Sequence, residues 1–211
     1  MTPADPLDLL LSNLDRALKA IFVTPAPGRP MPSPAEPISP LTEADRTESA
    51  RLMRVNHAGE IAAQALYHGQ AAVARDPKVR EFLLQAAREE ADHLAWCDQR
   101  LRELGSRPSL LGPLWYAGSF ALGAAAALAG DRVSLGFVSE TERQVEGHLA
   151  SHLDRLPKAD VASRTVLESM RSDEVAHGAA ARAAGGAELP QPAQDAMRAT
   201  ARVMTSTSYW I

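Results

Sequence analysis

Apolar residues recur at steps of three and four along most of this chain, which is the spacing of one helix face. Residues 7–22 show the pattern first and predict a short amphipathic helix, with one apolar side made of Leu7, Leu11, Leu14, Leu18 and Ile21. Further helical patterns follow at roughly 43–74, 77–104, 131–156, 160–184 and 191–204. No stretch alternates between apolar and polar residues for long enough to predict a strand, so the pattern predicts an all-α fold.

Proline, glycine and capping residues mark the boundaries between these helices. Asp76-Pro77 offers an N-cap with proline in the first turn, Asp131 can cap the helix that begins there, and Gly105 can end the second long helix. Residues 24–40 hold seven of the fifteen prolines, a density that excludes a helix or a central strand. We therefore expect three regions: an N-terminal helix (1–23), a proline-rich linker (24–40) and one main domain (41–211).

Residues 108–130 contain no charged side chain, and their length approaches that of a bilayer span. Ala, Gly and Ser dominate the stretch, and Pro113 interrupts it early, so a spanning helix is not the prediction. Two interpretations stay open. The stretch is a buried connecting helix, or it is a helix that dips into a membrane interface with Trp115 and Tyr116 at the depth of the headgroups.

Composition and charge exclude several classes of protein. Hydrophobic residues make up 45% and charged residues 23% of the 211 positions, which are ordinary values for a globular domain. The net charge of −4 argues against a basic nucleic-acid binder. One cysteine, Cys97, excludes an internal disulfide framework and a Cys-rich zinc site. The first residues lack the pattern of a signal peptide, so we expect the protein in the cytosol or on the cytosolic face of a membrane.

Two Glu-x-x-His tetrads carry the candidate chemistry: Glu90 with His93, and Glu174 with His177. Residues three apart on a helix share a face, so each pair can grip one metal ion. In each half of the chain a further glutamate lies on the preceding helix. Glu142 follows Glu60 by 82 residues, and each residue of the second tetrad follows its counterpart by 84. This near-constant offset indicates a repeated helical hairpin.

One glutamate from each of two helices, together with Glu-x-x-His from each of two others, is the ligand pattern of ferritin-like dimetal bundles. Four carboxylates supply a charge of −4, which two divalent ions neutralise, whereas four buried carboxylates alone would repel one another. Carboxylate and imidazole ligands suit iron or manganese. The sequence therefore predicts a ferritin-like four-helix bundle that holds two such ions.

Several neighbours of the predicted ligands leave alternatives open. Glu146 lies one turn after Glu142 and Glu140 lies two residues before it, and spacing alone does not separate Glu142 from Glu146. His57 lies one turn before Glu60 and, like His148 and His152, can hydrogen-bond near the site or stay outside it. We treat His68 as a bystander because it lies roughly 80° round the helix from Glu60. Cys97 is expected to be a buried, inert thiol.

Five short segments together resemble the demethoxyubiquinone hydroxylases of ubiquinone biosynthesis. They are Arg54–Glu60 (RVNHAGE), Glu89–Leu94 (EEADHL), Gly136–Glu142 (GFVSETE), Asp173–His177 (DEVAH) and Met204–Ser208 (MTSTS). The resemblance covers roughly residues 41–211, and its NHAGE segment is specific to this family among ferritin-like proteins. The proline-rich linker is longer than the family pattern suggests, and the sequence assigns it no function.

The resemblance implies a di-iron monooxygenase and, unlike the spacing, selects Glu142 over Glu146. Its metal ligands would be Glu60, Glu90, His93, Glu142, Glu174 and His177, with Glu90 and Glu174 as the bridging pair. The implied substrate is a membrane-embedded polyprenylated methoxy-methyl-benzoquinol, hydroxylated with O2. NADH is the implied external reductant. The sequence contains no Gly-x-Gly-x-x-Gly turn between a strand and a helix, so we expect no built-in NAD-binding domain.

The same resemblance implies a peripheral protein on the cytoplasmic face of the cell inner membrane, with a lipid-binding accessory protein that presents the quinone. Three other functions remain as alternatives. They are an iron-storage or peroxide-reducing protein like ferritin or rubrerythrin, a metal-free helical interaction module, and a hydroxylase of modified RNA. The net charge of −4 speaks against the last.

Overall fold

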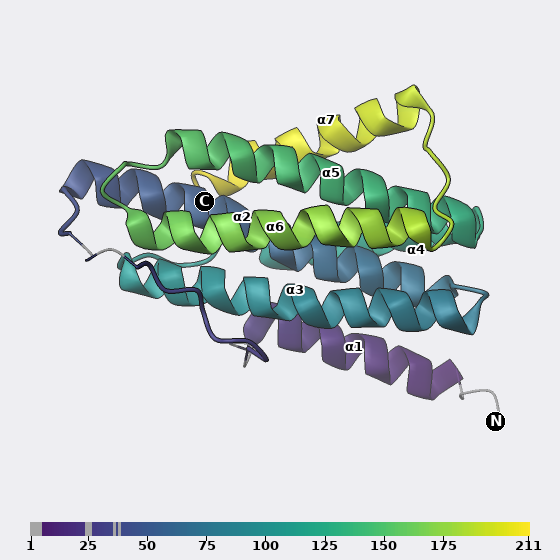
Figure 1. Ribbon diagram of the computed structural model, residues 1–211. Helices are drawn as coiled ribbons and strands as arrows, with labels where there is room; N and C mark the ends of the chain where they lie inside the picture. Colours follow the sequence, from purple (N-terminus) through teal and green to yellow (C-terminus); the bar gives the residue numbers. More distant parts are fainter. Residues whose placement is uncertain (1–5, 24–26, 36, 38) are drawn as a thin grey trace.

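A computed structural model describes residues 6–23, 27–35, 37 and 39–211. These residues form seven helices and no strand, so the all-α prediction is confirmed (Figure 1). The helices are α1 (Pro6–Phe22), α2 (Glu43–Val73), α3 (Pro77–Glu103), α4 (Gly112–Leu128), α5 (Asp131–Arg155), α6 (Val161–Ala183) and α7 (Gln191–Ser208).

The helices of the bundle pack as two hairpins. Helices α2 and α3 form one close pair and α5 and α6 form the other, and the four run side by side (Figure 1). Their shared core at one end of the bundle is fully buried and includes Leu52, Trp96, Leu149, Leu167 and Met170. Helix α7 lies across α2 and α5. This is the ferritin-like bundle that the repeated pattern predicts.

The helices begin and end at the capping residues that the sequence predicts, with one exception. The Asp76 carboxylate accepts the backbone N–H of Lys78 at 2.8 Å, and Gly105, with φ +70°, follows the end of α3. The prediction that Asp131 caps α5 is wrong: Gly130 holds the cap position, with φ +113°. The Asp131 carboxylate instead accepts the N–H groups of Arg75 and Asp76, because the corner between α2 and α3 lies against it.

Helix α4 is the connection between the two hairpins, and it lies along α2 with almost no side chain between the backbones. A Cβ atom built on Gly69 would lie 2.1 Å from the Phe120 oxygen, and one on Gly123 would lie 2.2 Å from the Leu66 oxygen. Tyr116 is buried and bonds to His68 at 2.9 Å, so it faces the bundle and not outward as the interfacial interpretation expected.

The other side of α4 is exposed. One face of the helix is therefore buried, as the connecting-helix interpretation expects, and the other presents Leu114, Leu122 and Leu128 to the surroundings, with the exposed Leu110 just before the helix begins. None of the helices in the described part of the chain is both long and apolar enough to cross a membrane.

Helix α1 packs on this same side of the bundle through small residues. Ala17, Ala20 and Ile21 lie in one cluster with Ile61, Ala65, Leu94, Tyr116 and Phe120. The leucines that predicted the amphipathic helix are about half exposed: Leu7, Leu11, Leu14 and Leu18. The described part of the linker is neither helix nor strand, as expected, and it crosses in front of α3 in Figure 1.

Candidate metal centre

Four helices each direct part of one acidic cluster into the middle of the bundle. Helix α2 supplies Glu60 and α5 supplies Glu142, while α3 and α6 each supply one Glu-x-x-His tetrad. The four glutamates and His93 are at most 3% exposed. The six predicted ligands therefore meet at one place, although the first and the last, Glu60 and His177, are 117 positions apart in the sequence.

The ligand atoms form two overlapping groups, each able to hold one metal ion. The first contains Glu60, Glu90, His93 and Glu174, and the second contains Glu90, Glu142, Glu174 and His177. In the first, His93 Nδ1 lies 2.9 Å from Glu90 Oε2 and 3.3 Å from Glu174 Oε1. In the second, His177 Nδ1 lies 3.2 Å from Glu90 Oε1. Glu90 and Glu174 belong to both groups, which is the arrangement that a bridging pair requires.

Unsatisfied buried atoms in the cluster fit cations. Both carboxylate oxygens of Glu142, one oxygen each of Glu90 and Glu174, and His177 Nδ1 have no hydrogen-bond partner. Buried polar atoms in native proteins almost always have a partner, so this concentration marks atoms that are placed to bind something else. The donors are carboxylate oxygens and imidazole nitrogens, the set that iron and manganese prefer.

The electrostatics of the cluster lead to the same conclusion. Burial, and then the neighbouring carboxylates, raise the pKa of Glu142 well above its usual value. Burial raises the pKa of Glu60 as well. Burial acts against protonation of His177, but the nearby carboxylates of Glu174 and Glu90 outweigh this and raise its pKa to about 10. The cluster therefore takes up protons when nothing else balances its charge, and bound cations would replace them.

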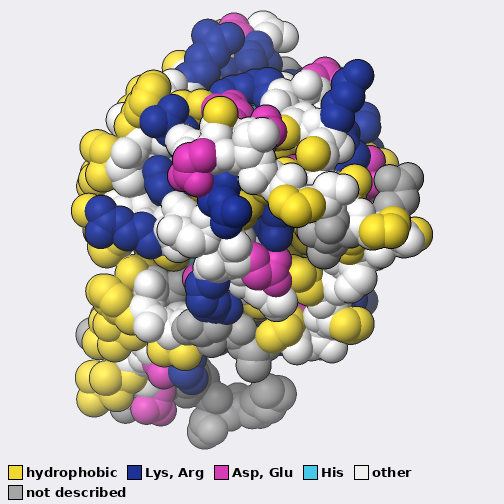
Figure 2. All heavy atoms as spheres, turned by 90° about the vertical axis from the view of Figure 1, so that its left-hand side faces the viewer, with side chains coloured by type: hydrophobic (Ala, Val, Ile, Leu, Met, Phe, Trp, Pro, Cys, Tyr) yellow, Lys and Arg dark blue, Asp and Glu magenta, His cyan; other side chains and the backbone are white. Residues whose placement is uncertain are grey.

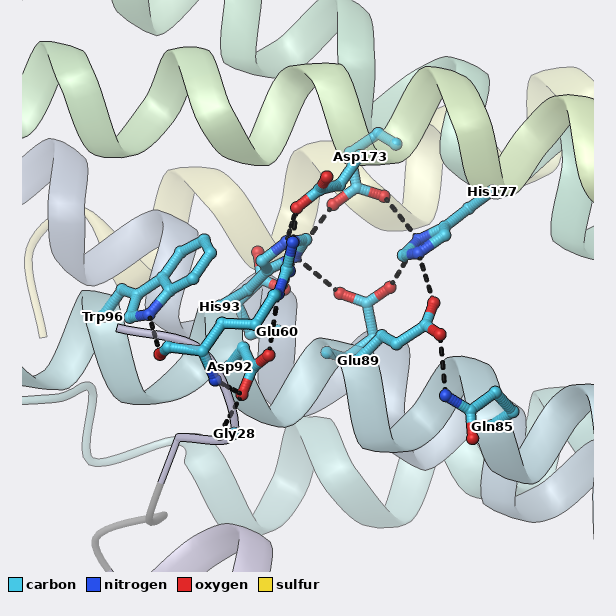
Figure 3. Close-up of polar contacts among 12 residues, drawn as sticks. Gly28, Glu60, Gln85, Glu89, Asp92, His93, Trp96, Asp173 and His177 are labelled. Carbon is cyan, nitrogen blue, oxygen red and sulfur yellow. Dashed lines mark hydrogen bonds and ion pairs between the residues drawn. The ribbon is translucent and has the colours of Figure 1, made fainter. Parts of the chain in front are cut away.

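Each histidine is held from behind by a carboxylate of the opposite Glu-x-x-His helix (Figure 3). His93 Nε2 lies 3.0 Å from Asp173 Oδ2, and His177 Nε2 lies 2.8 Å from Glu89 Oε2. These bonds turn Nδ1 of each ring toward the cluster. Sequence reasoning missed both residues. The available signal was an acidic residue directly before each tetrad, in Glu89-Glu90 and in Asp173-Glu174.

The structure separates Glu142 from the alternatives. Glu146 pairs with Arg171 at 2.6 Å on the surface between α5 and α6. Glu140 pairs with Arg143, also at 2.6 Å, on the side of α5 away from the cluster's ligand atoms. Neither residue belongs to a ligand group, whereas Glu142 is 1% exposed and belongs to the second.

The remaining histidines lie outside the two groups. Within the described residues, no hydrogen bond joins His57 or His148 to any of the six predicted ligands. The structure therefore gives no support for the expectation that they hydrogen-bond to the ligands. His152 bonds to Asn56 at 2.9 Å, and His68 bonds to Tyr116. Burial lowers the pKa of His57 to about 4, so this side chain is neutral.

Cys97 is completely buried beside Met170, and burial raises the pKa of its thiol. It is the inert thiol that the sequence predicts.

A cavity of about 810 Å³ reaches the cluster from the surface between α3 and α6. Its wall includes His177, and the other lining side chains are mainly charged or polar, among them Arg29, Arg88, Glu89, Asp92 and Asp173. This is the side where the linker crosses the bundle, so the linker forms part of the cavity wall.

Two helical hairpins that together supply four glutamates and two histidines define the class of ferritin-like dimetal bundles. Comparisons with known proteins narrow this class. The family model described as "Ubiquinone biosynthesis protein COQ7" matches residues 47–208, and the chain belongs to this family.

Several relatives that match along nearly the whole chain carry the name 3-demethoxyubiquinol 3-hydroxylase. The protein of Bordetella petrii is 58% identical over 98% of this chain and 92% of its own length. The protein of Ralstonia pickettii is 55% identical over 97% of this chain and all of its own. The protein of Variovorax paradoxus is 58% identical, with 97% and 98% covered.

Proposed function

We propose that the acidic cluster is a di-iron centre and that this protein hydroxylates the ring of demethoxyubiquinol with O2. The observation that carries the proposal is the buried set of four glutamates and two histidines, which forms two ligand groups with a shared carboxylate pair. The names of the relatives supply the reaction, and the cluster gives this chain the residues to perform it.

Each half of the cluster would hold one of the two iron ions. Glu60 and His93 would hold one ion, Glu142 and His177 the other, and Glu90 and Glu174 would bridge them. When bound, ferrous iron supplies the electrons and open coordination positions that activate O2. Over a full turnover one oxygen atom enters the quinol ring and the other leaves as water, which requires two electrons and two protons in total from outside the substrate. We propose NADH as the external source of these electrons.

The protein's own contribution is to hold the ligands rigidly in a dry core. Asp173 and Glu89 fix the two imidazole rings from behind, which sets their direction and their strength as donors. Trp96 packs with its ring centre 5.3 Å from that of His93 and, being 2% exposed, closes this end of the cluster to water.

An exposed apolar surface supports peripheral attachment to the cytoplasmic face of the cell inner membrane. It joins the leucine stripe of α1 to the outer face of α4, which are neighbours because Ile21 packs with Tyr116 and Phe120. Hydrophobic side chains gather along the left-hand edge of Figure 2, the side that lies at the back of Figure 1. A polyprenyl tail keeps the substrate in the bilayer, so an enzyme that uses it must come to the membrane surface. A lipid-binding accessory protein that presents the quinone belongs to the same proposal.

The test is quinone profiling by mass spectrometry in a bacterial strain that lacks its own hydroxylase. The wild-type gene should restore ubiquinone and reduce the demethoxy precursor, and Glu90→Ala or Glu174→Ala should abolish the effect. Glu146→Ala is the matched control because it removes a carboxylate from the same bundle but not from the cluster. If the precursor persists although the purified protein carries two iron ions per chain, the proposed substrate is wrong.

A further inference from the structure

The described part of the proline-rich linker is fastened across the bundle mainly around Arg29. The Arg29 guanidinium forms two ion pairs, with Nε 2.9 Å from Asp92 Oδ2 and Nη2 2.8 Å from Asp173 Oδ2. The backbone N–H of Gly28 donates to Asp92 Oδ1 at 2.6 Å, so both oxygens of Asp92 are bonded to this segment (Figure 3). We call residues 27–35 the strap.

Trp96 holds the strap from below. The centre of the Arg29 guanidinium lies 4.9 Å from the centre of the Trp96 ring, and Trp96 Nε1 donates to the Arg29 carbonyl oxygen at 3.3 Å. A guanidinium stacked over tryptophan loses much of its freedom to rotate, so the planar fork is already oriented toward its two carboxylates.

The two carboxylates lie on different helices. Asp92 is on α3 and Asp173 is on α6, the two helices that carry the Glu-x-x-His tetrads, and these two approach each other much less closely than the partners within each hairpin do. Arg29 therefore links the two helices that carry the Glu-x-x-His tetrads.

The contact with Asp173 leads directly to a predicted ligand. Arg29 Nη2 and His93 Nε2 bond to the same atom, Asp173 Oδ2, at 2.8 and 3.0 Å. On the other side, Glu89, which holds His177, accepts a hydrogen bond from the neutral amide of Gln85 at 2.7 Å. The two halves of the cluster thus have different support.

We propose that Arg29 is a positioning residue for the metal centre: by locking the strap across α3 and α6 it fixes the Asp173 carboxylate, and through it the His93 ring. This rests on the proposed function only in that the cluster binds metal. The sequence pattern suggested no function for the linker, and this proposal makes the linker part of the metal site. Its effect is confined to the half that contains His93.

The experiment measures Co²⁺ binding to the metal-free, full-length protein by visible absorption. Two backgrounds isolate the halves: Glu142→Ala leaves the half with His93 intact, and Glu60→Ala leaves the half with His177 intact. Loss of a group that holds a ligating histidine weakens metal binding by about 10- to 100-fold. Arg29 contacts Asp173 and not His93 itself, so its loss should have a smaller effect. We expect Arg29→Ala to weaken Co²⁺ binding roughly 3- to 10-fold in the Glu142→Ala background and to leave binding in the Glu60→Ala background unchanged.

Arg155→Ala is the matched control. Arg155 is half exposed like Arg29, pairs with Glu48 on another helix at 2.8 Å and lies over the ring of Tyr209 at 5.2 Å, but it has no contact with the cluster. It should change neither half. Arg29→Lys keeps the charge without the fork and should restore only part of the affinity. If the bundle of Arg29→Ala unfolds, Arg29→Gln replaces it in the same comparison.

A change in the Co²⁺ absorption bands of the half with His93 would show that the ring itself has moved. The proposal is overturned if Arg29→Ala matches Arg155→Ala in both backgrounds, or if it weakens both halves equally. Failure of the proposed dimetal site has a different signature, because the wild-type protein would then bind fewer than two Co²⁺ ions; failure of the proposed reaction would appear in quinone profiling and leave Co²⁺ binding unchanged.

Discussion

Replacing Gly123 by alanine should separate α4 from α2. The new Cβ atom would lie 2.2 Å from the carbonyl oxygen of Leu66 and 2.9 Å from its carbonyl carbon. Favourable contacts between such atoms begin at about 3.5 Å. The obstacle is backbone within a helix and no side-chain rotation relieves it, so the two helices must move apart by roughly 1 Å.

The expected magnitude follows from two opposed effects. Overpacking of a well-packed contact costs about 1–3 kcal/mol, and a rigid backbone contact belongs at the upper end. Alanine is a better helix former than glycine by about 1 kcal/mol, which offsets part of this cost. Gly123→Ala should therefore reduce the free energy of unfolding by about 2 kcal/mol, which in a domain of this size lowers Tm by roughly 4–8 °C.

Circular dichroism during thermal and urea unfolding measures the change, and Gly118→Ala is the control. Gly118 lies on the same helix, but a Cβ atom there meets nothing within 4 Å, so the substitution should stabilise the protein by about 0.5–1 kcal/mol. The reasoning is refuted if Gly123→Ala is as stable as Gly118→Ala.

Three further outcomes can be checked. Glu142→Ala should remove one metal ion per chain, measured by elemental analysis, whereas Glu146→Ala should leave the metal content unchanged; the reverse order would move the ligand. Burial lowers the pKa of His68 to about 4, so the folded state binds its proton less readily than the unfolded state does. The neutral His68 side chain therefore contributes fully to the free energy of unfolding above about pH 6.5, its pKa in the unfolded state. This contribution is lost as the pH falls toward about 4. His68→Gln should therefore reduce the pH slope of the free energy of unfolding over that window by up to about 1.4 kcal/mol per pH unit, and an unchanged slope in urea titrations would contradict this. Arg100→Met should lower the free energy of unfolding by about 3 kcal/mol because it leaves Asp160, paired at 2.9 Å and 1% exposed, as an uncompensated buried charge; equal urea midpoints would count against it.

Sequence was sufficient for the helices and for the pairing within each Glu-x-x-His tetrad because both depend on local periodicity. Glu90 and His93 share a face by spacing alone, and the same holds for Glu174 and His177. The choice of Glu142 over Glu146 was different, since both lie on the same face of one helix. Only the family resemblance made that choice from sequence, and the position of α5 against α6 now shows its cause.

What sequence did not reveal depends on contacts between distant segments. The sequence predicted an apolar side of α1 but not which residues meet the bundle: the leucines are about half exposed, and Ala17, Ala20 and Ile21 make the contact. Asp131 was predicted to cap its own helix, but it bonds to a corner about 55 residues earlier. Arg29 lay in a segment without any periodic pattern, so nothing local connected it with Asp92 or Asp173.

The crossed support of the two histidines has a consequence for how the protein is assembled. His93 comes from the first hairpin and is held by a carboxylate of the second, while His177 comes from the second and is held by a carboxylate of the first. Neither hairpin supplies the carboxylate that orients its own histidine, so the two hairpins depend on each other although their sequences repeat one pattern. Such reciprocity is what two identical hairpins would produce by pairing as a symmetric dimer. In the single chain the two supporting carboxylates themselves differ by one methylene group, since Asp173 stands where the other half has Glu89.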